Sequence, residues 1–98
     1  MRMMMKVELD TDRASAAIQD GSLPQLMQAT LERLQPEAAY FGPEAGLRTA
    51  FIVFDLKDPS QLPPIAEPLY SKFAARIQMF PVMNREDLQQ GLGQLGSA

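Results

Sequence analysis

Apolar and polar residues alternate with a period of two in several short segments of the chain. The clearest is residues 3–9, where Met3, Met5, Val7 and Leu9 fall on one side and Lys6 and Glu8 on the other. This pattern is typical of a half-buried β-strand. Four strands are predicted in all, at residues 3–9, 36–42, 48–56 and 75–83. The last of them contains Pro81 and therefore suits the edge of a sheet.

Helical periodicity fills the gap between the first two strands. Asp10 offers a capping oxygen to an alanine-rich segment that Gly21 interrupts. Ser22 can cap a second helical piece, which Pro36 ends. The apolar stripe of this second piece consists of Leu23, Leu26, Met27, Leu31 and Leu34.

A third helix is predicted between the last two strands. Asp58 and Gln61 have the spacing of a capping box at its start. Pro68 either limits the regular helix to residues 69–73 or kinks a longer one, because proline lacks the N–H that a helix interior uses. The residues GPEAG at 42–46 predict the loop of a hairpin, and Tyr40, beside Phe41, is predicted in the core.

A fourth helix is predicted at the end of the chain. Asn84 and Asp87 can cap it, and three glycines make it weak in isolation. Its leucines are Leu88, Leu92 and Leu95, which form a stripe. We expect this stripe to dock on the same domain or on a partner's domain, closing a barrel end or an exposed strand edge.

The order of the predicted elements is β-α-β-β-α-β followed by a terminal helix. It indicates an α+β fold of the ferredoxin-like type, a four-stranded antiparallel sheet with its helices on one face. The first and third strands are expected at the centre of the sheet. The length of 98 residues and the 46% hydrophobic content predict one globular domain, residues 1–98.

The strand at 48–56 has two apolar faces. Its even positions are continuously apolar after Arg48 and are assigned to the helix-covered face; they are Ala50, Ile52, Phe54 and Leu56. Phe51 and Val53 then lie on a face that a single chain leaves bare. An exposed apolar patch normally marks an interface. The sequence therefore predicts a homodimer formed sheet against sheet, since two-fold dimers are the commonest assembly.

The bare face is also predicted to carry charge. A trial antiparallel register of the first and last strands places Met4 opposite Phe80, Lys6 opposite Gln78 and Glu8 opposite Arg76. A cross-strand Glu8–Arg76 pair would be favourable, and charges buried between two sheets need partners or a ligand. The candidate ligand-binding residues are Lys6, Glu8, Arg76, Gln78, Phe51 and Phe80. Each also has a structural interpretation, as a paired interface charge or as packing.

Composition excludes several kinds of chemistry. The chain has no cysteine and no histidine, which removes thiol nucleophiles, thiolate metal sites and the commonest general base. No calcium-loop or phosphate-loop spacing is present, so neither a metal site nor a cofactor is predicted. The net charge of −3, with scattered basic residues, argues against a nucleic-acid partner. Neither a signal peptide nor a membrane span is expected, and the location is expected to be cytoplasmic.

Four segments resemble a group of small bacterial domains without an assigned activity, and the likeness covers nearly the whole chain. They are PEAAYF (36–41), LRTAFIVFDL (47–56), AEPLY (66–70) and PVMNREDL (81–88). More broadly, the chain resembles the dimeric α+β barrel superfamily. This resemblance implies two sheets around an interior that holds a small aromatic, polyketide or haem-like ligand. Haem-degrading members use a histidine ligand, which this chain lacks, and no catalytic residue is carried over.

Three functional classes fit these observations. The first is a homodimeric small-ligand-binding or structural module with a pocket inside the barrel. The alternative is a cofactor-independent enzyme, similar to a monooxygenase or an isomerase, acting on a small aromatic or enolic substrate. In that case Glu8 would be the base and Lys6 its electrostatic partner. The third is an amino-acid-sensing regulatory domain, which is normally attached to an enzyme.

Overall fold

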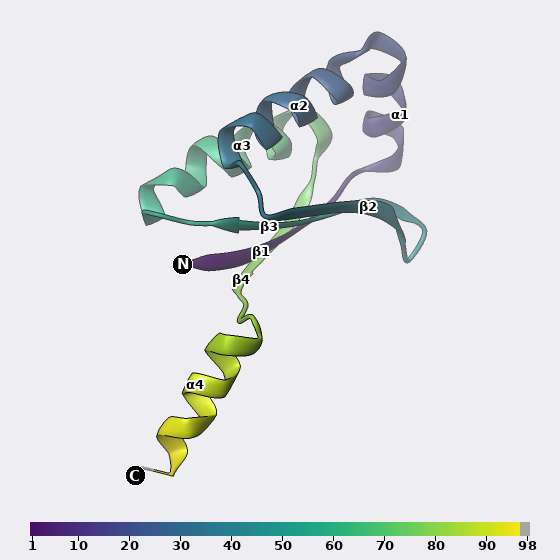
Figure 1. The fold of residues 1–98 in the computed structure, drawn as a ribbon. Helices are drawn as coiled ribbons and strands as arrows, with labels where there is room; N and C mark the ends of the chain where they lie inside the picture. The colour runs from purple at the N-terminus through teal and green to yellow at the C-terminus, as the bar shows by residue number, and fades with distance from the viewer. Residues whose placement is uncertain (97–98) are drawn as a thin grey trace.

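Four strands form one antiparallel sheet in the order β2-β3-β1-β4 (Figure 1). They are β1 (Arg2–Glu8), β2 (Ala38–Glu44), β3 (Leu47–Asp55) and β4 (Arg76–Pro81). The computed structural model describes residues 1–96, so residues 97 and 98 of the predicted domain lie outside the described residues. The first and third strands are central, as the sequence predicted. This strand order is consistent with the ferredoxin-like pattern.

Three α-helices lie on one side of the sheet, and a fourth projects from the other side (Figure 1). The first three are α1 (Thr11–Asp20), α2 (Ser22–Leu34) and α3 (Leu62–Phe73), with a short 3-10 turn, η1 (Pro59–Gln61), leading into α3. The fourth, α4 (Arg85–Leu95), follows β4. The prediction that the helices between the strands cover a single face is confirmed.

The break between α1 and α2 follows from local chemistry. The carboxylate of Asp10 accepts a hydrogen bond from the backbone N–H of Arg13 at 3.0 Å and caps α1. Gly21 adopts a φ of 84°, in the left-handed region that glycine enters without steric cost, and there it ends α1 and begins α2. The helical region predicted from the sequence is therefore two helices that meet at Gly21.

The helix α3 runs through Pro68, so the longer of the two predicted helices is the one that forms. Asp58 and Gln61 make the predicted capping box ahead of it. Pro68 interrupts the hydrogen-bond ladder of the helix interior. Ile65, Leu69 and Phe73 lie on both sides of the proline and are all buried. Burial of such side chains stabilises the fold by roughly 1.5–3 kcal/mol each, which offsets the lost hydrogen bond.

The hairpin between β2 and β3 is tighter than the sequence predicted. The predicted loop at 42–46 is wrong in extent, because β2 continues through Pro43 to Glu44 and only Ala45 and Gly46 form the turn. Both turn residues have positive φ, 53° and 79°, as in a type I′ turn. Pro43 is tolerated because β2 is an edge strand.

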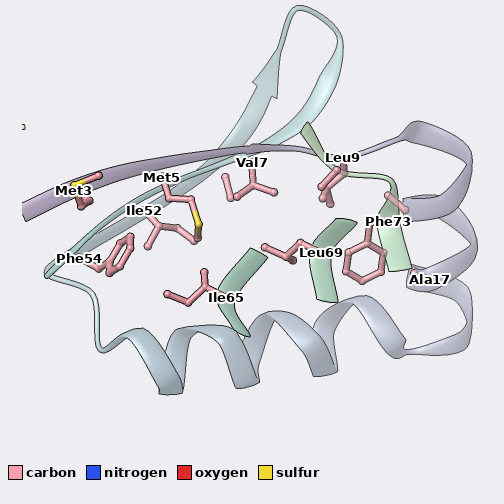
Figure 2. Close-up of a cluster of buried hydrophobic side chains, with 13 residues drawn as sticks. Met3, Met5, Val7, Leu9, Ala17, Ile52, Phe54, Ile65, Leu69 and Phe73 are labelled. Atoms are coloured by element: carbon pink, nitrogen blue, oxygen red, sulfur yellow. The ribbon is translucent and has the colours of Figure 1, made fainter. Parts of the chain in front are cut away.

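The hydrophobic core lies between the sheet and the three helices (Figure 2). The odd positions of β1 and the even positions of β3 point into it, as predicted; they are Met3, Met5 and Val7, and Ala50, Ile52 and Phe54. Ile65, Leu69 and Phe73 of α3 meet them from the helix side. Because strand side chains alternate, burying one set commits the other set to the opposite face.

Candidate functional site

The opposite face of the sheet carries the even positions of β1, β2 and β4 and the odd positions of β3. We call it the open face, because α1, α2 and α3 all lie on the other side (Figure 1). Its apolar side chains are only partly covered: Met4, Phe51 and Val53 are half-buried, and Phe80 is 44% exposed. A row of apolar residues therefore crosses three strands on this face.

Tyr40 also lies on the open face, where it is 70% exposed, so its predicted core position is wrong. Tyr40 pairs with Phe51 across β2 and β3, which places both rings on the same side. The neighbouring Phe41 pairs with the buried Ala50 and takes the helix side. Two adjacent aromatic residues in a strand point to opposite faces, so only one of them could face the core.

All six candidate ligand-binding residues lie on the open face. The register of β1 and β4 is the predicted one: Met4 pairs with Phe80, Lys6 with Gln78 and Glu8 with Arg76. On its other side Lys6 pairs with Phe51 of β3. The structure therefore brings Lys6, Glu8, Gln78 and Arg76 together beside two phenylalanines, Phe51 and Phe80.

The ion pairs on this face differ from the predicted one. Lys6 Nζ lies 3.8 Å from Glu8 Oε1 and also forms a salt bridge with Glu44. Arg76 is exposed, and within residues 1–96 it forms no salt bridge, so the expected Glu8–Arg76 ion pair is absent there. Lys6 and Glu8 are two positions apart on one face of a central strand, whereas Arg76 is on an edge strand, where water can solvate it.

Sequence reasoning missed Glu44 as a partner of Lys6. The two residues are 38 positions apart, and the sequence predicts a loop at 42–46, which contains Glu44. The two-residue turn at Ala45 and Gly46 keeps Glu44 in β2 and on the open face. The dipeptide Ala-Gly is a weaker signal for such a turn than Asn-Gly or Asp-Gly.

Lys6 is held in its charged form. The hydrogen bond that its ammonium group donates to Glu44 raises the pKa of Lys6 above its ordinary value; burial opposes this, and the charges of Glu44 and Glu8 add to it. Lys6 is therefore a cation at neutral pH and cannot accept a proton. It can neutralise a carboxylate or stabilise a developing negative charge.

A second charge cluster fixes the start of α4. Arg2 Nη1 donates to Asp87 Oδ2 at 2.9 Å, while Arg2 Nε donates to Glu37. The hydrogen bond with Glu37 is the main cause of a raised pKa for Arg2. Asn84 accepts from the backbone N–H of Asp87 at 2.8 Å, which confirms the predicted capping box. The first turn of α4 is thus attached to Arg2, the first residue of β1.

Beyond this attachment α4 stands away from the rest of its own chain (Figure 1). Every residue from Arg85 to Leu95 is exposed, including the three leucines of its stripe. The expectation that this helix docks on its own domain is therefore wrong for the single chain. Docking on a partner's domain stays a prediction.

Two general findings bear on the chemistry of the described residues. In the part of the chain from 1 to 96, no three acidic side chains gather so that they could hold a metal ion. None of the helices described is long and apolar enough to cross a membrane.

The candidate site is the apolar surface of the open face together with a charged cluster of Lys6, Glu8, Glu44 and Arg76. In comparisons with family models, curated proteins and solved structures, nothing matches this chain.

Proposed function

We propose that this protein is a homodimer of the dimeric α+β barrel type, in which two ferredoxin-like sheets enclose a binding site for a small ligand. The observation that carries the proposal is the mixed character of the open face. Half-buried Phe51 and Val53 on a central strand lie beside charged Lys6 and Glu8 on the next strand. A large apolar surface of this kind normally marks an interface.

A second copy of the chain suits this face better than an unrelated partner. Two stacked sheets lie about 10 Å apart, close enough for the aromatic side chains of both to pack between them. The charges of the open face also balance: the cations are Arg2, Lys6 and Arg76, and the carboxylates are Glu8, Glu44 and Asp55. Two such faces therefore carry no net charge that would repel them. A two-fold axis would place both charged clusters in one interior.

The ligand that fits this interior is a small aromatic or enolic acid. Phe51 and Phe80 offer rings for the apolar body of the ligand. The guanidinium of Arg76 presents a planar fork for a carboxylate or an enolate and forms no salt bridge within residues 1–96. Lys6 forms salt bridges with Glu8 and Glu44 and provides a second positive charge on the same face.

One observation favours catalysis at the same place. Glu8 lies 3.8 Å from a lysine that is held protonated. A carboxylate base beside a fixed cation can remove a proton next to a carbonyl group and stabilise the enolate that forms. Catalysis predicts that hydrogen–deuterium exchange into an enolisable ligand is accelerated by the protein and lost in Glu8→Gln, while simple binding predicts no acceleration.

The assembly is tested by sedimentation equilibrium at micromolar concentration. The wild-type protein should have the mass of a dimer. Phe51→Asp should give a monomer or an insoluble protein, because a carboxylate without a partner is costly to bury. Tyr70→Asp, on the exposed side of α3, is the matched control and should remain dimeric. A wild-type protein that stays monomeric at high concentration would refute the proposal.

Ligand binding is tested by thermal unfolding with a panel of small aromatic and enolic acids. A ligand at about a hundred times its Kd should stabilise the folded protein by about 2.7 kcal/mol. Arg76→Met should abolish this stabilisation and leave the dimer mass unchanged, whereas Arg33→Met on α2 should behave as wild type. If no acid in the panel stabilises the wild type, or if Arg76→Met responds equally, the binding site is not on this face.

A further inference from the structure

The terminal helix α4 is an arm with a fixed direction and an uncovered apolar stripe. Leu88, Leu92 and Leu95 are 46%, 55% and 71% exposed, and their spacing of four and three residues places them on one face of the helix. Asp87 both caps α4 and binds Arg2 at the start of β1, so the first turn of α4 is held against the sheet. Figure 1 shows α4 extending from the side of the sheet opposite to α1, α2 and α3.

The length of this arm exceeds the spacing between two stacked sheets. An α-helix of 11 residues is about 16 Å long, and the sheets of a sandwich lie about 10 Å apart. In a dimer formed by two open faces, an arm that points out of the open face extends beyond the partner's sheet. Its last turn therefore extends past the partner's sheet, toward the side on which the partner's helices lie.

A shallow, open apolar groove is present on that side, beside the edge strand β2. We call it the α2–β2 groove; it comprises two adjoining hollows of about 590 and 460 Å³ that share Pro24, Met27 and Phe41. Phe41 points to the helix side of the sheet and is still 56% exposed, because α2 leaves this edge uncovered. Leu31 extends the groove along α2.

The stripe is short enough to fit within the groove, and both surfaces are apolar. From Pro24 to Gln35 the groove follows α2 for about 16 Å, and from Leu88 to Leu95 the stripe is about 10 Å long. The rim of the groove carries Glu32 and Arg48, and the first turn of α4 carries Arg85 and Glu86 beside Asp87, which binds Arg2. An amphipathic helix in an apolar groove is a recurrent mode of recognition, in which residues spaced as these leucines are serve as anchors.

We propose that α4 of one chain docks in the α2–β2 groove of a second copy, and this rests on the sheet-to-sheet dimer proposed above. The groove and the arm of one chain lie on opposite sides of its own sheet, so the contact forms between chains. A two-fold dimer contains two arms and two grooves, and every arm then has a groove. The same contact covers the exposed edge strand β2, which would otherwise be free to pair with other chains.

The absence of cysteine from the sequence allows a direct test by cross-linking. Met27→Cys in the groove and Leu92→Cys in the stripe are combined in one chain and treated with a short bismaleimide. The expected product is a covalent dimer in high yield, detected by denaturing mass spectrometry. The matched control combines Leu92→Cys with Gln25→Cys, which is on the exposed side of α2, and should give little covalent dimer.

Each other outcome overturns the inference. A cross-linked monomer would show that the arm folds back onto its own groove, and equal yields from the two pairs would show that the contact is not specific. Sedimentation of the untreated double variant separates this inference from the proposed dimer. A dimer without the Met27–Leu92 cross-link refutes only the docking of α4, whereas a monomer refutes the sheet-to-sheet assembly as well.

Discussion

On the open face, the side chain of Lys6 forms salt bridges with two carboxylates, Glu8 on its own strand and Glu44 on β2. Arg76 is exposed at the sheet edge and forms no salt bridge within residues 1–96. The two cations therefore differ in what they do for the folded chain. Lys6 contacts two carboxylates in the folded chain, whereas Arg76 is the cation that would bind the proposed ligand.

The first prediction separates these two roles by double-mutant cycles in urea unfolding. Lys6→Met combined with Glu8→Gln should show a favourable coupling, because both side chains are about 80% covered and lie 3.8 Å apart. Glu8→Gln combined with Arg76→Met should couple by less than about 0.3 kcal/mol. A larger coupling for Glu8 and Arg76 than for Glu8 and Lys6 would contradict this assignment.

Among the elements, the β2–β3 hairpin contains a residue that fits its turn poorly. Ala45 has a φ of 53°, and an L-residue with a Cβ atom enters this region at a cost of roughly 1 kcal/mol. The turn nevertheless forms because Gly46 accepts its own positive φ and the strands on both sides pair in full. The same turn places Glu44 within reach of Lys6.

The second prediction concerns this turn. Ala45→Asn should raise the free energy of unfolding by about 0.5–1 kcal/mol, because Asn-Gly is the preferred pair for a type I′ turn. Ala45→Val, as the control, should lower it, since a β-branched residue is strongly disfavoured at positive φ. Chemical denaturation of the three proteins measures both changes. Equal stability of the Asn and Val variants would mean that the turn is not type I′ in solution.

The third prediction concerns the cap that precedes α3. Hydrogen bonds from Ser60 lower the pKa of Asp58 below its ordinary value, so a proton binds Asp58 more weakly in the folded chain than in the unfolded chain. The stabilisation is complete above the unfolded pKa of about 3.9 and is lost as pH falls through the lower folded value. Asp58→Asn keeps a capping oxygen but does not titrate.

Thermal unfolding of wild type and Asp58→Asn between about pH 6 and pH 2 measures this effect. The stability of the wild type relative to Asp58→Asn should fall below about pH 4 and be unchanged above about pH 5. Glu67→Gln, on the exposed side of α3, serves as the control for general acid destabilisation. A difference in stability between wild type and Asp58→Asn that does not vary with pH would show that titration of Asp58 does not contribute to acid unfolding.

At the scale of the whole molecule, the single chain leaves three apolar surfaces uncovered: the open face, the stripe of α4 and the α2–β2 groove. It is correspondingly elongated, with principal extents of 56, 29 and 18 Å. A chain of this size buries a limited fraction of its surface on folding. Apolar surface that stays exposed in the single chain therefore leaves it appreciably less stable. The proposed dimer, together with the proposed docking of α4, covers all three surfaces in one closed assembly.

The fourth prediction follows from this dependence on assembly. If folding and association are coupled, the wild-type Tm should rise by several degrees over a hundredfold increase in protein concentration, because mass action favours the dimer. Soluble Phe51→Asp should have a lower Tm that does not change with concentration. Scanning calorimetry of both proteins at the lowest and highest concentrations of this range measures the change in Tm. A wild-type Tm independent of concentration would show that each chain is stable alone.

The sequence determined the parts of this protein that depend on local patterns. The period of two in β1 and β3 fixed which side chains face the core, and Asp10, Asp58 and Asn84 marked three helix starts through hydrogen bonds that span only a few residues. Once the faces of the strands were assigned, Phe51 of β3 fell on the open face, and the register of β1 and β4 placed the other five candidate residues there. These are short-range or periodic constraints, which a sequence displays directly.

Tertiary structure alone decided the features that depend on competition between distant groups. Lys6 pairs with Glu44, 38 positions away, because the hairpin turn is short enough to keep Glu44 in the sheet. Pro68 stays inside α3 because Ile65, Leu69 and Phe73 bury enough apolar surface to outweigh a missing hydrogen bond. The terminal helix points away from its own domain because Arg2 holds its first turn. In each case the outcome is a balance of free energies between groups that only the folded chain brings together.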